Sequence, residues 1–151
     1  MSAQTHTVSA VTKADYPALI ELWEASVRAT HHFLTEEWIV EHKPLILNQY
    51  FDLVALACIR TAEGEIMGFL GTAEGNIEML FVSPSCFKKG VGQALIKYAV
   101  NQQNAQAVDV NEDNPGARAF YERMGFEVLS RSELDGQGNP YPILHMKLKT
   151  P

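Results

Sequence analysis

The fold is decided by one stretch, Ile77-Glu78-Met79-Leu80-Phe81-Val82-Ser83-Pro84-Ser85-Cys86-Phe87-Lys88-Lys89-Gly90-Val91-Gly92-Gln93-Ala94-Leu95-Ile96. β-Branched and aromatic residues at its start predict a strand, Pro84 marks a turn, and Gly90 and Gly92 open an amphipathic helix. The first backbone N–H groups of a helix are unpaired, and the helix dipole favours negative charge beside them. The stretch therefore predicts a loop that binds phosphate.

Two well-known phosphate loops do not match these residues. A nucleotide P-loop needs Lys-Ser or Lys-Thr after its last glycine, but Gln93 and Ala94 follow Gly92. The dinucleotide fingerprint needs a third glycine where Leu95 stands. Asp109 lies at a suitable distance for that fingerprint's ribose contact, but 151 residues are too few for its two-halved fold. A glycine-rich turn that only begins a helix is the remaining structural interpretation of the motif alone.

A second motif follows downstream, Val110-Asn111-Glu112-Asp113-Asn114-Pro115-Gly116-Ala117-Arg118-Ala119-Phe120-Tyr121-Glu122-Arg123-Met124-Gly125-Phe126. Asn114 and Pro115 form a good N-cap and first-turn pair, and Gly125 is a good helix end. Phe120 and Met124, at helical spacing, are more typical of a core face than of a cofactor contact. The motif alone therefore predicts a helix. A chemical role for it can be inferred only in combination with the first motif.

Together the two motifs resemble the signatures of the GNAT superfamily of acetyl-coenzyme A-dependent N-acyltransferases. Phe87-Lys88-Lys89-Gly90-Val91-Gly92 is similar to the superfamily's Arg/Gln-x-x-Gly-x-Gly/Ala motif, with Phe87 where Arg or Gln is usual. The resemblance runs from about Val8 to Leu148 and is strongest between Ile77 and Phe126. It implies an N-acetyltransferase that transfers the acetyl group of acetyl-coenzyme A to a primary amine by direct attack in a ternary complex. A non-catalytic acetyl-coenzyme A-binding module or sensor is the alternative, suggested by Phe87.

The order of expected elements matches the superfamily. Strands are expected at 8–11, 53–59, 66–72, 77–82, 107–110, 127–133 and 141–148, and helices after Thr12, at 36–49, at 91–103 and after Asn114. Pro44 should bend or split the second helix. The fold class is α/β (α+β), with a mixed, mostly antiparallel sheet of about six to seven strands and helices on both faces. The resemblance implies a splay between strands 4 and 5, in a single domain over residues 1–151.

The resemblance also implies which residues bind the cofactor. Pantetheine would lie along the backbone of Leu80, Phe81 and Val82. The remaining implied contacts are Phe87, Lys88, Lys89, Gly90, Val91, Gly92 and Gln93 at the diphosphate, with Asn114, Ala117 and Tyr121 from the second motif. Tyr121 matches the family tyrosine that gives a proton or hydrogen bond to the coenzyme A sulfur. A tyrosine packed in the helix with its hydroxyl satisfied is the structural alternative.

Acetylation of an alkylamine needs a proton acceptor, since an amine with a pKa near 10.4 is mostly charged at pH 7. Glu78 stands where several family members carry a base, and burial there would raise its pKa. A solvent-facing strand residue is the alternative.

His31 and His32 are the competing bases, in Ala29-Thr30-His31-His32-Phe33-Leu34. This segment and Pro140-Tyr141-Pro142 resemble a bacterial GNAT subgroup with Ala-Thr-His-x-Phe-Leu and Pro-Tyr-Pro motifs. His31 is favoured because it matches that pattern, and a surface or capping role is the alternative for either histidine.

The net charge and its distribution along the chain limit the classes of binding partner that are expected. The net charge of -6 argues against nucleic acid, which binds basic surfaces. Residues 1–86 carry eleven acids and four bases, while residues 87–151 carry seven acids and eight bases. The acidic half would supply the acceptor side, which favours a cationic amine, either a small molecule or a peptide. A monomer or homodimer is expected.

Cys58 and Cys86 have no metal-binding or disulfide spacing, so reduced thiols and no metal are expected. A relay through a Cys86 thioester would be the nucleophilic alternative, but no activating base for it can be identified in the sequence. Neither a membrane span nor a signal pattern is recognised, and a cytoplasmic location without membrane contact is expected.

Overall fold

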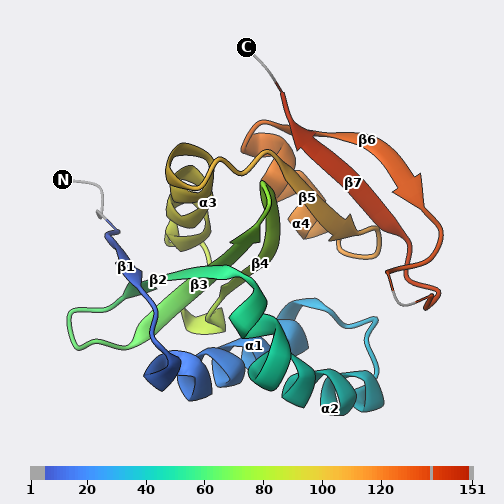
Figure 1. The fold of residues 1–151 in the computed structure, drawn as a ribbon. Coiled ribbons are helices and arrows are strands. Elements are labelled where there is room, and N and C mark those ends of the chain that lie inside the picture. Colours follow the sequence, from blue (N-terminus) through green and yellow to red (C-terminus); the bar gives the residue numbers. More distant parts are fainter. Residues whose placement is uncertain (1–5, 137, 150–151) are drawn as a thin grey trace.

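A computed structural model describes residues 6–136 and 138–149. Within them the strands form one seven-stranded sheet in the order β1-β2-β3-β4-β5-β7-β6 (Figure 1). The strands are β1 (Val8–Ala10), β2 (Ala55–Arg60), β3 (Ile66–Ala73), β4 (Asn76–Val82), β5 (Ala107–Asn111), β6 (Phe126–Ser132) and β7 (Ile143–Leu148). Neighbouring strands pair antiparallel except β4 and β5, which are parallel. The prediction of a mixed, mostly antiparallel sheet is confirmed.

Helices cover both faces of the sheet. The α-helices are α1 (Tyr16–Thr30), α2 (Glu36–Leu45), α3 (Val91–Gln102) and α4 (Pro115–Arg123). Short 3₁₀ turns occupy Lys13–Asp15, Phe51–Leu53 and Pro84–Cys86, and a π-helical turn occupies Ile46–Tyr50. Helices α1 and α2 lie on one face and α3 and α4 on the other (Figure 1). Each face thus has its own hydrophobic core.

A β-bulge in β4 divides that strand between the two cores. Gly71 of β3 is opposite Met79, but the next residue, Thr72, is opposite Ile77, so Glu78 is the extra residue. Ile77 is buried with α3 and α4, whereas Met79 is buried with α1 and α2. In a regular strand residues two apart share a face, so the bulge reverses the direction of the side chains that follow.

Most predicted boundaries differ from the structure by one or two residues, and two of the differences have a clear local cause. The α-helix that begins after Thr35 ends at Leu45 and continues as the π-helical turn instead of reaching residue 49. Pro44 explains this change, because it has no N–H for the helical hydrogen bond. The last strand begins at Ile143 instead of residue 141, since the Tyr141 N–H bonds the Asn139 carbonyl in a loop.

Candidate active site

Strands β4 and β5 separate after a short parallel contact. Only Asn76 with Ala107 and Ile77 with Val108 are paired within the described part of the chain. Beyond that point the two strands diverge, as the expected splay requires. The fork leaves the β5-facing edge of β4 from Glu78 to Val82 without a strand partner.

The register shows which backbone groups face this gap. The Ser83 N–H bonds the Met67 carbonyl of β3 at 2.8 Å. Since successive residues of a strand direct their N–H groups to opposite sides, Leu80 and Val82 direct theirs away from β3. The gap therefore offers a row of unpaired amides to an extended ligand.

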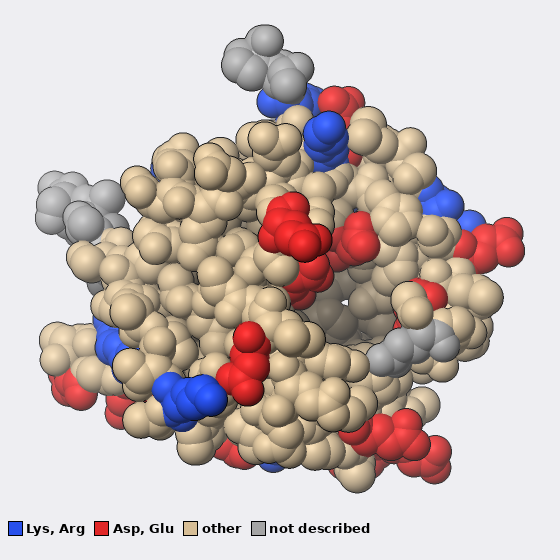
Figure 2. Space-filling model, viewed as in Figure 1, with Lys and Arg blue, Asp and Glu red and all other residues tan. Residues whose placement is uncertain are grey.

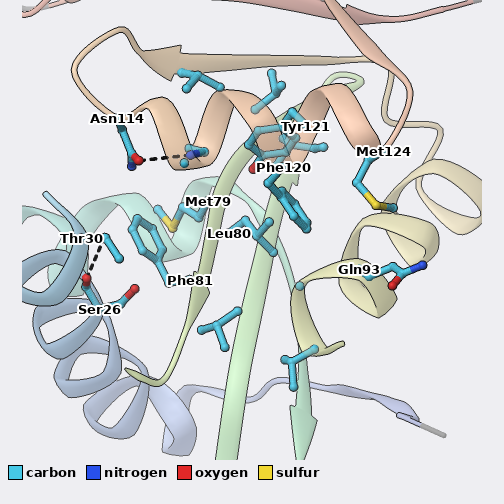
Figure 3. Close-up of a pocket in the computed structure, with 18 of the residues that line it drawn as sticks. Ser26, Thr30, Met79, Leu80, Phe81, Gln93, Asn114, Phe120, Tyr121 and Met124 are labelled. Carbon is cyan, nitrogen blue, oxygen red and sulfur yellow. Dashed lines mark hydrogen bonds between the residues drawn. The ribbon is translucent and has the colours of Figure 1, made fainter. Parts of the chain in front are cut away.

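A cavity of about 930 Å³ fills the fork. Side chains from α1, β4, α3 and α4 surround it (Figure 3). Of the residues predicted to form the site, fourteen line it: His31, Glu78, Leu80, Phe81, Val82, Phe87, Lys88, Gly90, Val91, Gly92, Gln93, Asn114, Ala117 and Tyr121. The fold thus brings both sequence motifs to one opening.

The loop before α3 has the geometry of an anion site. Gly90 is the N-cap and has φ +82°, a left-handed conformation that costs a side-chain-bearing residue energy. The first helical bond runs from the Ala94 N–H to the Gly90 carbonyl. Among the described residues, no acceptor bonds the backbone N–H groups from Lys88 to Gln93. These six donors are available to a diphosphate.

Lys89 departs from the predicted arrangement. It does not line the fork cavity but a smaller groove beside it, together with His6, Lys88, Gly90, Gln93, Ala94 and Lys97. Its carbonyl is 2.7 Å from the Nε2 atom of His6. Lys89 therefore faces the outer side of the loop, with Lys97.

Tyr121 projects from α4 into the cavity. Its side chain is 7% exposed and packs edge-on against the rings of Phe120 and Phe126. Its hydroxyl has no hydrogen-bond partner in the described residues, yet it is not sealed from the cavity. Burial raises the pKa of this phenol, so Tyr121 is protonated at neutral pH. A buried, unpaired donor of this kind can serve a ligand.

Glu78 lies at the bulge of β4, next to the point where β4 and β5 separate. Burial raises the pKa of its carboxyl, and the charges of Asp109 and Glu74 raise it further. A raised pKa makes a carboxylate a better proton acceptor near neutral pH.

His31 follows the last residue of α1, and its ring is held in one tautomer. Its Nδ1 is 2.7 Å from the Thr30 hydroxyl, which donates its own proton to the Ser26 carbonyl. Nδ1 must therefore carry hydrogen, and Nε2 presents a lone pair to the Asn114 amide at 3.5 Å. Burial, followed by the charge of His32, lowers the pKa of His31 below 6.5. The ring is thus neutral at pH 7.

An aromatic contact joins the segments 29–34 and 140–142. The ring centroids of Phe33 and Tyr141 are 5.9 Å apart, and those of His31 and Phe33 are 5.5 Å apart. The segments 29–34 and 140–142, which the sequence singled out separately, therefore meet beside the cavity.

Some lining residues were missed from the sequence. Ser26, Thr30, Met79, Asn111 and Asp109 all line the cavity. Asp109 was noticed only as a ribose contact in a fold that this chain does not have. Its alternation with buried Val108 and Val110 gave the one usable signal, an outward-facing acid on a central strand.

The chain matches the family model of the acetyltransferase (GNAT) domain over residues 24–150. The chain belongs to the GNAT acetyltransferase family. It is 34% identical over 128 residues to the peptidyl-lysine N-acetyltransferase YjaB of Salmonella typhimurium, covering 85% of this chain and 88% of that protein.

Solved structures agree with the GNAT fold. The solution structure of apo YjaB from Escherichia coli superposes with a TM-score of 0.85 at 29% identity, covering 98% of this chain and all of that one. The PaiA N-acetyltransferase of Thermoplasma acidophilum, solved with coenzyme A, superposes with a TM-score of 0.73 at 18% identity, covering 97% and 100%.

Family membership identifies the chain as a GNAT-type acyltransferase, a family that uses acetyl-coenzyme A. Over residues 6–136 and 138–149, no group of three or more His, Cys, Asp or Glu is arranged to hold a metal ion. No helix in the same residues is long and apolar enough to cross a membrane.

Proposed function

We propose that this protein transfers the acetyl group of acetyl-coenzyme A to the amine of a lysine side chain, by direct attack in a ternary complex. The observation that carries the proposal is the fork, where the unpaired amides of β4, the loop before α3 and Tyr121 line one cavity. The names of the YjaB and YiaC relatives, both peptidyl-lysine N-acetyltransferases, support lysine as the acceptor.

Cofactor binding begins at the loop. The six free N–H groups from Lys88 to Gln93 would bind the diphosphate, with Lys88 adding a positive charge. Phe87 lines the same opening and is 37% exposed, so it offers a ring face where relatives carry a polar side chain. Leu80 and Val82 would hydrogen-bond the pantetheine amides as an added strand does. Asn114 and Ala117 border the far side of the cavity.

The reacting groups lie deeper. The N–H of Leu80 would polarise the thioester carbonyl, and the Tyr121 hydroxyl would donate a hydrogen bond to the departing sulfur. Glu78 would remove a proton from the acceptor ammonium, directly or through water, so that the neutral amine can attack the thioester carbonyl. His31 is the second candidate for this step, since its neutral ring also borders the cavity.

Cys86 also lines the cavity, and within the described residues its thiol has one side-chain hydrogen-bond contact, with the Ser85 hydroxyl at 3.7 Å. A hydroxyl does not activate a thiol as a basic group does, which supports direct attack over a cysteine relay.

The test is acetyl transfer from acetyl-coenzyme A to Nα-acetyl-lysine methylamide, measured through the release of the free thiol of coenzyme A. We expect turnover by the native protein and a fall of about 10²–10⁴-fold in kcat/KM for Glu78→Gln, the usual worth of a general base. His31→Gln should fall less than about tenfold if Glu78 is the base. The reverse ranking would transfer the role to His31, and tight coenzyme A binding with no turnover on any amine would contradict the proposed activity.

Three further expectations stay part of the proposal. The subgroup with Ala-Thr-His-x-Phe-Leu and Pro-Tyr-Pro motifs is supported by the contact between Phe33 and Tyr141. A single domain is consistent with all described strands forming one sheet. A cytoplasmic site of action and a monomeric or homodimeric state remain expectations from the sequence.

A further inference from the structure

Glu78 and Asp109 stand on opposite sides of the fork. The last paired residues are Ile77 and Val108, so the next position on each strand carries a carboxylate. Both side chains line the cavity. Asp109 alternates with Val108 and Val110, which are buried against α3 and α4, so it faces the α1 side, while Glu78 is the bulged residue between Ile77 of that core and Met79 of the α1 and α2 core. Figure 2 shows acidic side chains gathered at the edge of the hollow in this region.

Asp109 is held from behind by a hydrogen-bonded line across three strands. The Nδ1 atom of His145 on β7 lies 2.7 Å from its Oδ1, and the Nε2 atom lies 2.7 Å from the Ser132 hydroxyl on β6. The Asp109 side chain is still 66% exposed. One carboxylate oxygen is thus fixed by His145, while the other has no partner in the described residues.

The same cavity has an independent sign of a ligand, Tyr121, a residue only 7% exposed whose hydroxyl faces the cavity without a partner in the described residues. If the reacting sulfur lies beside Tyr121, as the proposed function requires, the acceptor nitrogen has to approach past the two carboxylates. Lys88 of the loop and Arg123 of α4 line the cavity, but β4 and β5, which carry the two acids, contribute no Lys or Arg to it. An alkylammonium group would supply a positive charge to these acids.

We propose that Asp109 binds the ammonium group of the acceptor, and that His145 and Ser132 are positioning residues that hold its carboxylate at the fork. This inference rests on the proposed function and adds a division of roles between the two acids. Asp109 binds the incoming charge, and Glu78 takes the proton. The site therefore selects a flexible primary alkylamine that is charged in solution over a neutral isostere.

Binding can be measured without turnover. The protein is saturated with coenzyme A, and Nα-acetyl-lysine methylamide or its uncharged isostere Nα-acetyl-norleucine methylamide is titrated by NMR. We expect the native protein to bind the lysine compound at least about tenfold more tightly than the norleucine compound, the usual range for a charged hydrogen bond. Asp109→Asn should remove that difference, and Glu127→Gln, which changes an exposed acid on β6 outside the cavity, should keep it.

The positioning role has its own readout. His145→Gln and Ser132→Ala should raise KM for the lysine compound about threefold to tenfold, with kcat and the KM for acetyl-coenzyme A unchanged. Equal binding of the two compounds by the native protein, or unchanged preference in Asp109→Asn, would overturn the inference. If Asp109→Asn does not fold, the inference is tested by the binding of the lysine and norleucine compounds to the native protein and by the KM of His145→Gln for the lysine compound. Selective lysine binding without acetyl transfer would instead overturn the proposed activity and leave this site standing.

Discussion

Replacing Tyr121 by phenylalanine separates hydrogen bonding from full proton transfer. The ordinary pKa of a tyrosine is about 10 and that of a thiol about 8.5, and burial raises the tyrosine value further. Complete transfer from this phenol to a thiolate is therefore uphill by more than about 1.5 pKa units, or about 2 kcal/mol. Tyr121 is better suited to donate a hydrogen bond to the developing thiolate.

A hydrogen bond to a charged group contributes about 1.5–3 kcal/mol, so Tyr121→Phe should lower kcat about 10–150-fold. The folded protein should lose little stability, because this hydroxyl bonds no group of the described residues and opens onto the cavity. The melting temperature should therefore stay within about 2 °C of the native value.

Stopped-flow detection of thiol release and a thermal denaturation curve measure the two effects. Tyr98→Phe is the matched control, because Tyr98 is a half-buried tyrosine on α3 that does not line the cavity. A change in kcat below about threefold would remove Tyr121 from the reaction, and a loss above about 10³-fold would mean that it transfers its proton completely. A large drop in melting temperature would show that the hydroxyl has a structural partner.

Two further predictions concern the loop and the histidine. Gly90→Ala should destabilise the fold by about 1–2 kcal/mol and weaken coenzyme A binding. The φ angle of Gly90 is +82°, and the nearest atom to a new Cβ is 3.8 Å away, so the cost comes from backbone strain and not from crowding. Gly64→Ala, at φ +91° in a hairpin turn, should cost similar stability without affecting binding, and equal binding losses in both would refute the loop's role. Because the pKa of His31 is lowered from 6.5 by burial, the unfolded chain binds its proton first, and stability should fall as pH drops from 6.5 toward the folded value. Urea unfolding between pH 5 and 8 should show that the free energy of unfolding falls less toward acid pH in His31→Gln than in the native protein. The same pH dependence in both proteins would contradict a neutral, buried ring.

Local features of the fold were predictable where one residue dictates the geometry. The helix expected at 91–103 is observed at Val91–Gln102, since Gly90 supplies the left-handed cap. The Asn114 side chain accepts a hydrogen bond from the Ala117 N–H at 3.1 Å, as expected of an N-cap. Pro44 changed the helix where predicted, although it produced a wider turn and not a break.

The site required pairings that no local pattern contains. The line from Asp109 through His145 to Ser132 joins residues up to 36 positions apart, and it exists only because β7 lies between β5 and β6. Lys89 shows the same limit in reverse, since the motif fixes its position in the loop but not the side on which it emerges.

One residue links the two halves of the proposed chemistry. Glu78 is the bulged residue of β4 on its β3 side and the first residue beyond the fork on its β5 side. A bulge disrupts the ladder and usually costs stability, so its position at the fork calls for a reason. By reversing the faces of β4, it lets Ile77 complete the α3 and α4 core and Met79 complete the α1 and α2 core. The same reversal leaves Glu78 between the cores, where the proposed function needs a base between an amine on the α1 side and a thioester on the α3 side.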